Sequence, residues 1–528
     1  MDAPTNNPLK AERALLRATL AAGARRRLFA AMAVGVVLST RPPNVAGAAD
    51  HVVRVDATRI LGSANRNLAG AGWNTGSLSA IRPFAPPIVR VDGHLDRVSL
   101  RPGAIDLADV LEHVTEVHDA GGAPLVILFP MPRWLGEGSL ASCVPSPLAP
   151  TCDATKLPPS DFDAWEALIR DVVRELATAD PPARRFEVWN EPDIPVFWQG
   201  TRDEFLATAL ATHRAISDVV DETGIAIEVG GPGSAAAAGL IGPYAEAVAA
   251  AGLPLDFVSW HRYGNIPNLG PDGNEGLIDE DLYRLLAGVN PNTTPRDYGR
   301  EVGEVQQVVA DALAAARPDG ATGTGSGDEP ILLLDEWNLS SGGYDRRHDT
   351  NEGAAFALGV LIELERAGLD GAAYYRSVSG SAHVGDWGLV TPSGGRKPTW
   401  WVLDLWSRMA GRRIAVEGDD PATGLWARAV AGSGHVEVLL ATFVATGGSA
   451  TTVQLDVAGC DAASAEVATI DAASPSFADG ETRAVASGTL DLALADQSAT
   501  WVRLACERPD GTRPRRPRLP TLRRTTPP

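Results

Sequence analysis

Residues 186–192 read FEVWNEP, and residues 331–338 read ILLLDEWN. Each stretch contains an apolar, strand-like run that leads into a glutamate, Glu191 in the first and Glu336 in the second. A buried strand gains nothing from a carboxylate at its end unless that carboxylate is used, because burying an unpaired charge is costly. Two such glutamates on separate strands indicate a paired-carboxylate active site of the kind that cleaves glycosidic bonds.

The surrounding chain alternates strand-like runs with amphipathic helical runs such as 163–177 and 201–220. Eight strands separated by helical crossovers predict an α/β fold, the (β/α)8 TIM barrel. A doubly wound open sheet is the alternative, but the glycine-rich stretches 230–234 and 320–327 lack its phosphate-binding pattern. The expected strands are 69–73, 87–91, 124–129, 185–189, 225–229, 256–260, 331–334 and 371–375.

The chain divides into further parts on either side of the barrel, as expected for 528 residues. The barrel spans residues 68–410 and ends in a Trp-rich helix at 398–409, while 411–506 carry short alternating runs that predict a C-terminal antiparallel β-sandwich. Residues 50–67 are expected to add a strand to that sandwich. Residues 264–330 are long for a barrel connection and predict an insertion over one rim, and the Pro/Arg-rich tail 507–528 is expected to be disordered.

Residues 1–49 have the pattern of an export signal peptide. Three arginines at 25–27 precede an apolar run at 28–38, and 46–48 offer a cleavage site. The run is too short to span a bilayer, and the arginine pair fits either twin-arginine or Sec export. The sequence therefore predicts a secreted, periplasmic or extracellular protein. Its net charge of −20 argues against nucleic acid or an anionic membrane as partner and suits a neutral substrate.

The four cysteines suit an exported protein. Cys143 and Cys152 lie close together in the chain, and Cys460 and Cys506 bracket the last strand-rich region, so 143–152 and 460–506 are the economical pairing among the three possible ones. Free thiols are the alternative. Neither pair has the C-x-x-C spacing of a zinc or redox site, and we expect no metal and no cofactor.

Strand order brings the two glutamates together. Counted along the chain, Glu191 ends the fourth barrel strand and Glu336 the seventh, and all strands of a parallel barrel end at the same rim. At a separation of about 5–5.5 Å, one carboxylate attacks the anomeric carbon while the other protonates the leaving oxygen, with retention of configuration. The acid then needs a raised pKa, and the nucleophile needs donors that keep it ionised.

Several motifs, in the correct order, resemble glycoside hydrolase family 39, the clan A barrels that include β-xylosidases and α-L-iduronidases. The resemblance runs from Pro87 to Met409. It implies that Glu191 is the general acid/base and Glu336 the nucleophile. The similar segments are 189–198, which begins WNEP; 334–338, LDEWN; 89–93, VRVDG; 125–132; 230–232, GGP; and 256–261, DFVSWH.

The same resemblance implies roles for the neighbouring residues. Asn190 would hydrogen-bond the 2-hydroxyl of the sugar, and Arg90 would hold Glu336 ionised. From its position on the strand, and not from the resemblance, Glu187 is expected to face the opposite way and to be structural. The remaining candidates line the site or form a platform for the sugar: His261, Tyr263, Trp134, Trp337, Tyr374 and Arg376.

Two departures from the family pattern leave the sugar open. Asp92 stands where the family more often has histidine, and Trp337 after the nucleophile resembles arabinofuranosidases of the same clan. The leading hypothesis is an exported, retaining, β-xylosidase-like hydrolase acting on a glycoside or oligosaccharide. The alternatives are an α-L-arabinofuranosidase or other clan A glycosidase, and a non-catalytic carbohydrate-binding barrel.

Overall fold

The computed structural model describes residues 49–506, apart from 73–81, 144, 147–148, 238, 265–292, 317–328, 381 and 446. The expected export signal, the expected C-terminal tail, and most of the expected insertion between residues 264 and 330 lie outside the described residues. None of the described helices is both long enough and apolar enough to cross a membrane.

Eight parallel strands close into a barrel in sequence order, so the predicted (β/α)8 fold is confirmed. Each strand pairs in parallel with the next, and the last pairs with the first. The strands are β2 (Gly70–Gly72), β3 (Ile88–Asp92), β4 (Ala123–Leu128), β5 (Arg185–Val188), β6 (Glu228–Ser234), β7 (Phe257–Tyr263), β8 (Ile331–Asn338) and β9 (Gly371–Tyr374).

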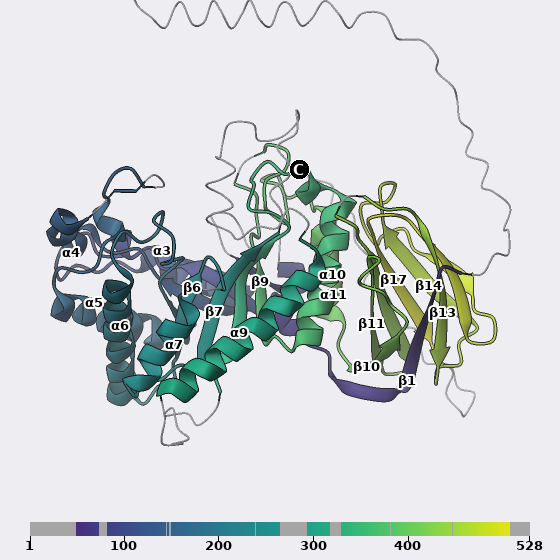
Figure 1. Ribbon diagram of the computed structural model, residues 1–528, viewed down its shortest axis with the longest axis horizontal. Coiled ribbons are helices and arrows are strands. Elements are labelled where there is room, and N and C mark those ends of the chain that lie inside the picture. Colours follow the sequence, from purple (N-terminus) through teal and green to yellow (C-terminus); the bar gives the residue numbers. More distant parts are fainter. Residues whose placement is uncertain are drawn as a thin grey trace, which may run out of the picture. The chain divides into compact units, whose positions relative to one another are not determined.

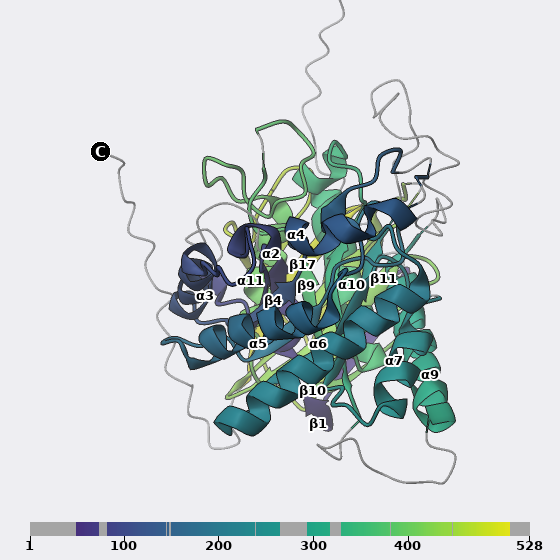
Figure 2. The same cartoon turned by 90° about the vertical axis from the view of Figure 1, so that its left-hand side faces the viewer.

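Amphipathic helices cover the outside of the barrel, and Figure 2 shows α5, α6, α7 and α9 there. Their ends follow local chemistry: Thr201 and Glu204 form a capping box at the start of α6, and Gly224 ends it with a φ of 66°. The main helices are α3 (Ala108–Asp119), α5 (Phe162–Thr178), α6 (Arg202–Thr223), α7 (Ile241–Ala250), α9 (Pro295–Ala316), α10 (Asn351–Ala367) and α11 (Pro398–Arg408), with short turns at α2 (Leu95–Val98) and α4 (Arg133–Gly136).

The barrel interior holds an apolar layer and, further along the strands, a polar one. Buried Ile88, Leu125, Phe257 and Leu333 form the apolar cluster. Two residues further along β3, β7 and β8 come Arg90, Ser259 and Asp335, which are buried together with Glu187 of β5. Because side chains alternate along a strand, residues two apart point the same way. The polar layer therefore lies between the apolar cluster and the carboxyl ends of the strands.

A second sheet of nine strands follows the barrel, in the hydrogen-bonded order β15-β14-β17-β12-β11-β10-β1-β13-β16. Buried residues from both halves of this sheet form one cluster, so the sheet folds over itself into two layers. Its strands are β1 (His51–Ser63), β10 (Arg412–Glu417), β11 (Leu425–Gly432), β12 (His435–Thr442), β13 (Thr451–Ala458), β14 (Ser464–Ile470), β15 (Glu481–Ala484), β16 (Thr489–Leu494) and β17 (Ser498–Ala505).

Strand β1, drawn in purple in Figure 1, lies among the green and yellow strands of this sheet although it precedes the barrel in the chain. It pairs antiparallel with β10 and parallel with β13, so the sheet is antiparallel except at this one pair. Both disulfides of the economical pairing are formed, Cys143–Cys152 and Cys460–Cys506.

Candidate active site

A distorted turn after β5 presents Glu191. The strand ends at Val188, and Trp189 and Glu191 have φ values of 74° and 47°, conformations that non-glycine residues adopt only when their surroundings hold them there. The buried Trp189 anchors the turn, since its Nε1 donates to the Phe197 carbonyl at 3.2 Å. The Glu191 backbone N–H donates to the Gly233 carbonyl at 2.8 Å. Both contacts fix where the carboxylate points.

A β-bulge in β8 presents Glu336. Leu334 pairs with Trp260 of β7 and Glu336 pairs with the next residue, His261, so Asp335 is an extra residue. In a regular strand Asp335 and Glu336 would face opposite sides. Here both reach Arg90: Asp335 Oδ2 lies 3.0 Å from its Nε, and Glu336 Oε2 lies 2.9 Å from its Nη1. The bulge therefore turns the second carboxylate into the barrel mouth.

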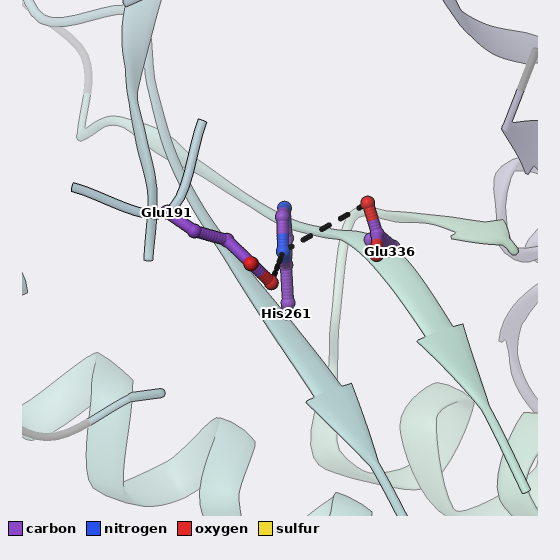
Figure 3. A group of neighbouring side chains, drawn as sticks. All are labelled: Glu191, His261 and Glu336. Carbon is purple, nitrogen blue, oxygen red and sulfur yellow. Dashed lines mark hydrogen bonds and ion pairs between the residues drawn. The ribbon is translucent and has the colours of Figure 1, made fainter. Parts of the chain in front are cut away.

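Glu191 and Glu336 face each other across His261 (Figure 3). One oxygen of each carboxyl group and a ring nitrogen of His261 all lie within 4.8 Å of one another. The His261 Nδ1 atom is 2.7 Å from Glu191 Oε1 and 3.9 Å from Glu336 Oε2. This spacing fits a retaining pair and leaves too little room for the water that an inverting pair holds, at about 6.5–9.5 Å.

The surroundings of Glu191 favour a protonated carboxyl group. Burial raises the pKa of Glu191 to about 7, although the charge of Arg90 opposes this. Its neighbour His261 is itself buried, which lowers the pKa of the imidazole to about 4 and leaves the ring neutral at pH 7. No full positive charge therefore sits against Glu191, as suits a general acid.

Glu336 has different partners. Arg90 Nη1 donates to its Oε2, and the Tyr263 hydroxyl donates to its Oε1. Burial raises the pKa of Glu336, while Arg90 and the Tyr263 hydrogen bond oppose that rise. Burial and the charge of Glu336 raise the pKa of Tyr263 well above its usual range, so the phenol keeps its proton and remains a donor. The site thus separates a proton-holding carboxyl from an anionic one.

Arg90 joins the two catalytic candidates to the polar layer below. Its Nε donates to Glu187 Oε2 at 2.7 Å, and its Nη2 donates to Asn190 Oδ1 at 2.9 Å. The expectation that Glu187 faces away is wrong: it is fully buried in the barrel, and its Oε1 accepts from Ser259 Oγ at 2.6 Å. It is inward-facing because Phe186 and Val188, its neighbours in the strand, pack in the main apolar core outside the barrel.

The donor atoms of Glu191, His261 and Glu336 converge closely enough to contact a cation, but we assign no metal site. Arg90 lies 2.9 Å from Glu336 and already supplies positive charge there. The three side chains suffice for the acid–base and nucleophilic chemistry of a paired-carboxylate site.

The reacting groups open into a cavity of about 270 Å3. Four predicted site residues line it: Glu191, Glu336, His261 and Tyr263. Tyr375 and Trp387 supply aromatic surface there, although no sequence motif marked them. The other described residues that line the cavity are Ile194, Ala235, Ala236, Arg262, Glu301 and Ser341.

Two of the four residues predicted to form the sugar platform, Trp337 and Tyr374, are buried away from the cavity. Trp337 is fully buried and packs edge to face against Tyr298 and Tyr374, on the helix side of β8. The Tyr374 hydroxyl donates to Asn338 Oδ1 at 2.8 Å. Neither side chain lines the cavity. Trp337 points outward because it follows the inward-facing Glu336, beyond the bulge in β8.

The other two candidates, Trp134 and Arg376, are not among the residues that line the cavity. Trp134 is half-buried, and its Nε1 donates to the Ser99 carbonyl at 3.1 Å. Arg376 stacks over the ring of Trp387, with its guanidinium carbon 5.5 Å from the ring centroid, and its Nη2 lies 3.1 Å from Asp386 Oδ1. Arg376 therefore supports an aromatic residue of the cavity.

Comparison with known proteins agrees with this geometry. The sequence model of "Glycosyl hydrolases family 39" matches residues 118–272. A β-xylosidase of Caldicellulosiruptor saccharolyticus is 26% identical over 276 residues, and the match spans 50% of this chain and 50% of that protein. The chain thus spans about half the length of this curated relative.

The fold is also shared with solved structures. A monomeric β-xylosidase from Caulobacter crescentus CB15 superposes with a TM-score of 0.65 at 17% identity, covering 86% of this chain and 99% of that one. The family 39 enzyme from Xanthomonas axonopodis pv. citri gives a TM-score of 0.64 at 17% identity, covering 89% and 100%. The resemblance to glycoside hydrolase family 39 is confirmed.

Proposed function

We propose that this relative of the family 39 glycoside hydrolases is a retaining glycosidase with β-xylosides as its preferred substrates. The observation that carries the proposal is the approach of the Glu191 and Glu336 carboxyl oxygens to within 4.8 Å, in a cavity, with different hydrogen-bond partners. A structural pair of acids would not need two distorted backbone segments to bring it together.

In the first step Glu336, held by Arg90 and Tyr263, attacks the anomeric carbon while Glu191 gives its proton to the departing glycosidic oxygen. The bond to the aglycone breaks, and a glycosyl ester forms on Glu336. Glu191, now ionised, takes a proton from water, and the resulting hydroxide attacks the same carbon and releases Glu336. Asn190, oriented by the hydrogen bond of its Oδ1 with Arg90, is placed beside Glu191 to bind a sugar hydroxyl.

The preference for β-xylosides rests on the named β-xylosidases among the relatives, by sequence and by fold. An α-L-arabinofuranosidase is the second candidate, favoured by Trp337 next to Glu336. A non-catalytic barrel is disfavoured because both glutamates and their donors are present. Export, and so a periplasmic or extracellular location, is proposed from the basic and apolar pattern of residues 25–48.

The test is a panel of aryl β-xyloside, α-L-arabinofuranoside, β-glucoside and α-L-iduronide, with the product anomer followed by NMR. We expect fastest turnover of the β-xyloside with retained configuration. Glu336→Ala should abolish turnover, and added azide should restore it and give an inverted glycosyl azide. No turnover of any substrate would refute the enzymatic proposal, and inverted product from the wild-type protein would refute the mechanism.

A further inference from the structure

The polar layer under the catalytic pair contains three carboxyl groups around one guanidinium. Arg90 contacts Glu187 at 2.7 Å, Glu336 at 2.9 Å and Asp335 at 3.0 Å. Glu187 and Asp335 are 0% and 1% exposed, and the mechanism above uses neither. Three ionised carboxylates would leave two uncompensated negative charges in the barrel interior, an arrangement that desolvation strongly disfavours.

Geometry identifies Asp335 as the group without a donor. The Arg90 Nε–H carries one hydrogen, and that hydrogen is donated to Glu187 Oε2. Neither oxygen of Asp335 accepts a hydrogen bond from any donor in the described part of the chain. His261 Nε2 is 3.8 Å from Asp335 Oδ1, which is beyond hydrogen-bond range. A buried carboxylate with no donor is unstable, whereas a carboxylic acid can itself donate.

The adjacent acceptor is Glu187. Glu187 Oε2 and Asp335 Oδ2 lie 2.7 and 3.0 Å from the same Arg90 Nε, so the two carboxyl groups are neighbours, and a proton on one of them removes one of the two uncompensated charges. Burial opposes the ionisation of Glu187, but the charge of Arg90 lowers its pKa. Burial and the charge of Glu187 raise the pKa of Asp335 well above its usual range. Glu187 also accepts from Ser259 Oγ, which further favours its anionic form.

We propose that Asp335 is a positioning residue that keeps its proton at neutral pH and donates it in a hydrogen bond to Glu187. Glu187 is then the permanent counter-ion of Arg90 on its Nε side, while Nη1 stays directed at Glu336. The β8 bulge makes this possible because it turns two consecutive side chains into the barrel. The protonation itself does not depend on the proposed function; its effect on Glu336 does.

The layer has little room to rearrange. A Cβ atom on Gly233 would lie 2.8 Å from Glu187 Oε1 and 3.2 Å from Arg90 Nη2. Gly233 also has a φ of 58°, a conformation that favours glycine. The backbone of β6 thus packs directly against the Arg90–Glu187 pair. The pair cannot shift away from Asp335, so the carboxyl group of Asp335 stays beside Glu187 and is stable there in its protonated form.

The direct test is infrared difference spectroscopy of wild-type protein against Asp335→Asn, both with 13C-labelled aspartate, at pH 7. The label on aspartate separates the signal of Asp335 from that of Glu191, whose pKa is about 7. We expect a protonated aspartate carbonyl band that is present in the wild type and absent in Asp335→Asn. Absence of that band in wild-type protein would overturn the inference, whether or not the protein hydrolyses any glycoside.

The second test is the pH profile of kcat/KM, whose acidic limb reports Glu336 in the free enzyme. Asp335→Asn replaces a neutral donor by a neutral donor, so the limb should stay in place. In the double variant Glu187→Gln/Asp335→Asn, Arg90 loses its other anion, and the limb should move down by about one pH unit, equivalent to about 1.4 kcal/mol. A downward shift in Asp335→Asn alone, or no shift in the folded double variant, would overturn it.

A buried ion pair of the same chemistry outside the site provides the control. Arg428 donates to both oxygens of Glu365, at 2.7 and 2.8 Å, where α10 meets β11. Glu365→Gln should lower thermal stability and leave the acidic limb unchanged. A shift in this control equal to that of the double variant would show that the limb responds to general destabilisation and would overturn the assignment.

Discussion

Of the donors to Glu336 among the described residues, the Tyr263 hydroxyl can be removed without disturbing a buried charge, and Tyr263→Phe therefore tests how the nucleophile is kept ionised. The hydroxyl donates to Glu336 Oε1, and Arg90 occupies the other oxygen. A hydrogen bond to a charged group contributes about 1.5–3 kcal/mol. Because one pKa unit corresponds to about 1.4 kcal/mol, the pKa of Glu336 should rise by about one to two units.

The sign of the effect on activity follows from the role of Glu336. The nucleophile acts as a carboxylate, so activity is lost as the pH falls through its pKa. A higher pKa moves the acidic limb of kcat/KM to higher pH, by about one to two units, and leaves the basic limb of Glu191 in place. The profile is measured with an aryl β-xyloside in wild-type protein and in Tyr263→Phe.

Tyr375→Phe is the matched control. Tyr375 lines the same cavity, and its ring lies 6.2 Å from that of Tyr263, but Glu336 takes its hydrogen bonds from Arg90 and Tyr263. We expect this variant to change KM and not the acidic limb. If Tyr263→Phe leaves the limb where it was, the hydrogen bond does not hold Glu336 ionised. If both variants move it equally, the effect comes from the cavity and not from that bond.

Three further predictions follow from single contacts. The basic limb of kcat/KM should lie near pH 7, because burial raises the pKa of Glu191 to about 7 and its protonated form is the active one. In Glu191→Ala, measured on a substrate with an activated leaving group, this limb should disappear. Gly233→Ala should lower both the denaturation midpoint and kcat, because the added Cβ would meet Glu187 and Arg90. Gly252 is the control: it has a similar φ of 67°, and a Cβ added there has nothing within 4 Å. Gly252→Ala should therefore lose only about 1–2 kcal/mol of stability and no activity. Cys460→Ser should reduce the free energy of unfolding by up to about 4 kcal/mol under oxidising conditions, because the bridge closes a loop of 46 residues; equal denaturation midpoints for variant and wild type would contradict this.

Most of the barrel strands and the two glutamates were predictable from sequence because both depend on local patterns, although the strand expected at 225–229 spans Glu228–Ser234. Apolar runs bounded by polar residues place each strand, and a parallel barrel brings all strand ends to one rim. That rule places Glu191 and Glu336 at the same rim of the barrel. The pairing of Cys143 with Cys152 was within reach for a similar reason, since the two residues are close in the chain.

The direction of individual side chains was not predictable, because it depends on a bulge that the sequence does not mark. Strict alternation along β8 would place Asp335 and Trp337 on one side and Glu336 on the other. The extra residue at Asp335 instead lets both acids face inward while Trp337 packs under α9. For this reason the prediction that Trp337 contributes to the sugar platform is wrong. The aromatic surface of the cavity comes from Tyr375, which directly follows β9, and from Trp387.

The same bulge explains why two glutamates of equal intrinsic acidity can take opposite roles. Because the bulge leaves both Asp335 and Glu336 facing inward, a third acid lies beside Arg90, and the charges of Glu187 and Glu336 add to burial in raising the pKa of Asp335. Protonation of Asp335 removes that repulsion, so the Arg90 charge remains shared between Glu187 and Glu336. Glu191 receives no hydrogen bond from Arg90, whose Nη2 is directed to Asn190, and it contacts a neutral His261. The mobile proton of the site therefore resides on Glu191, where the leaving group needs it.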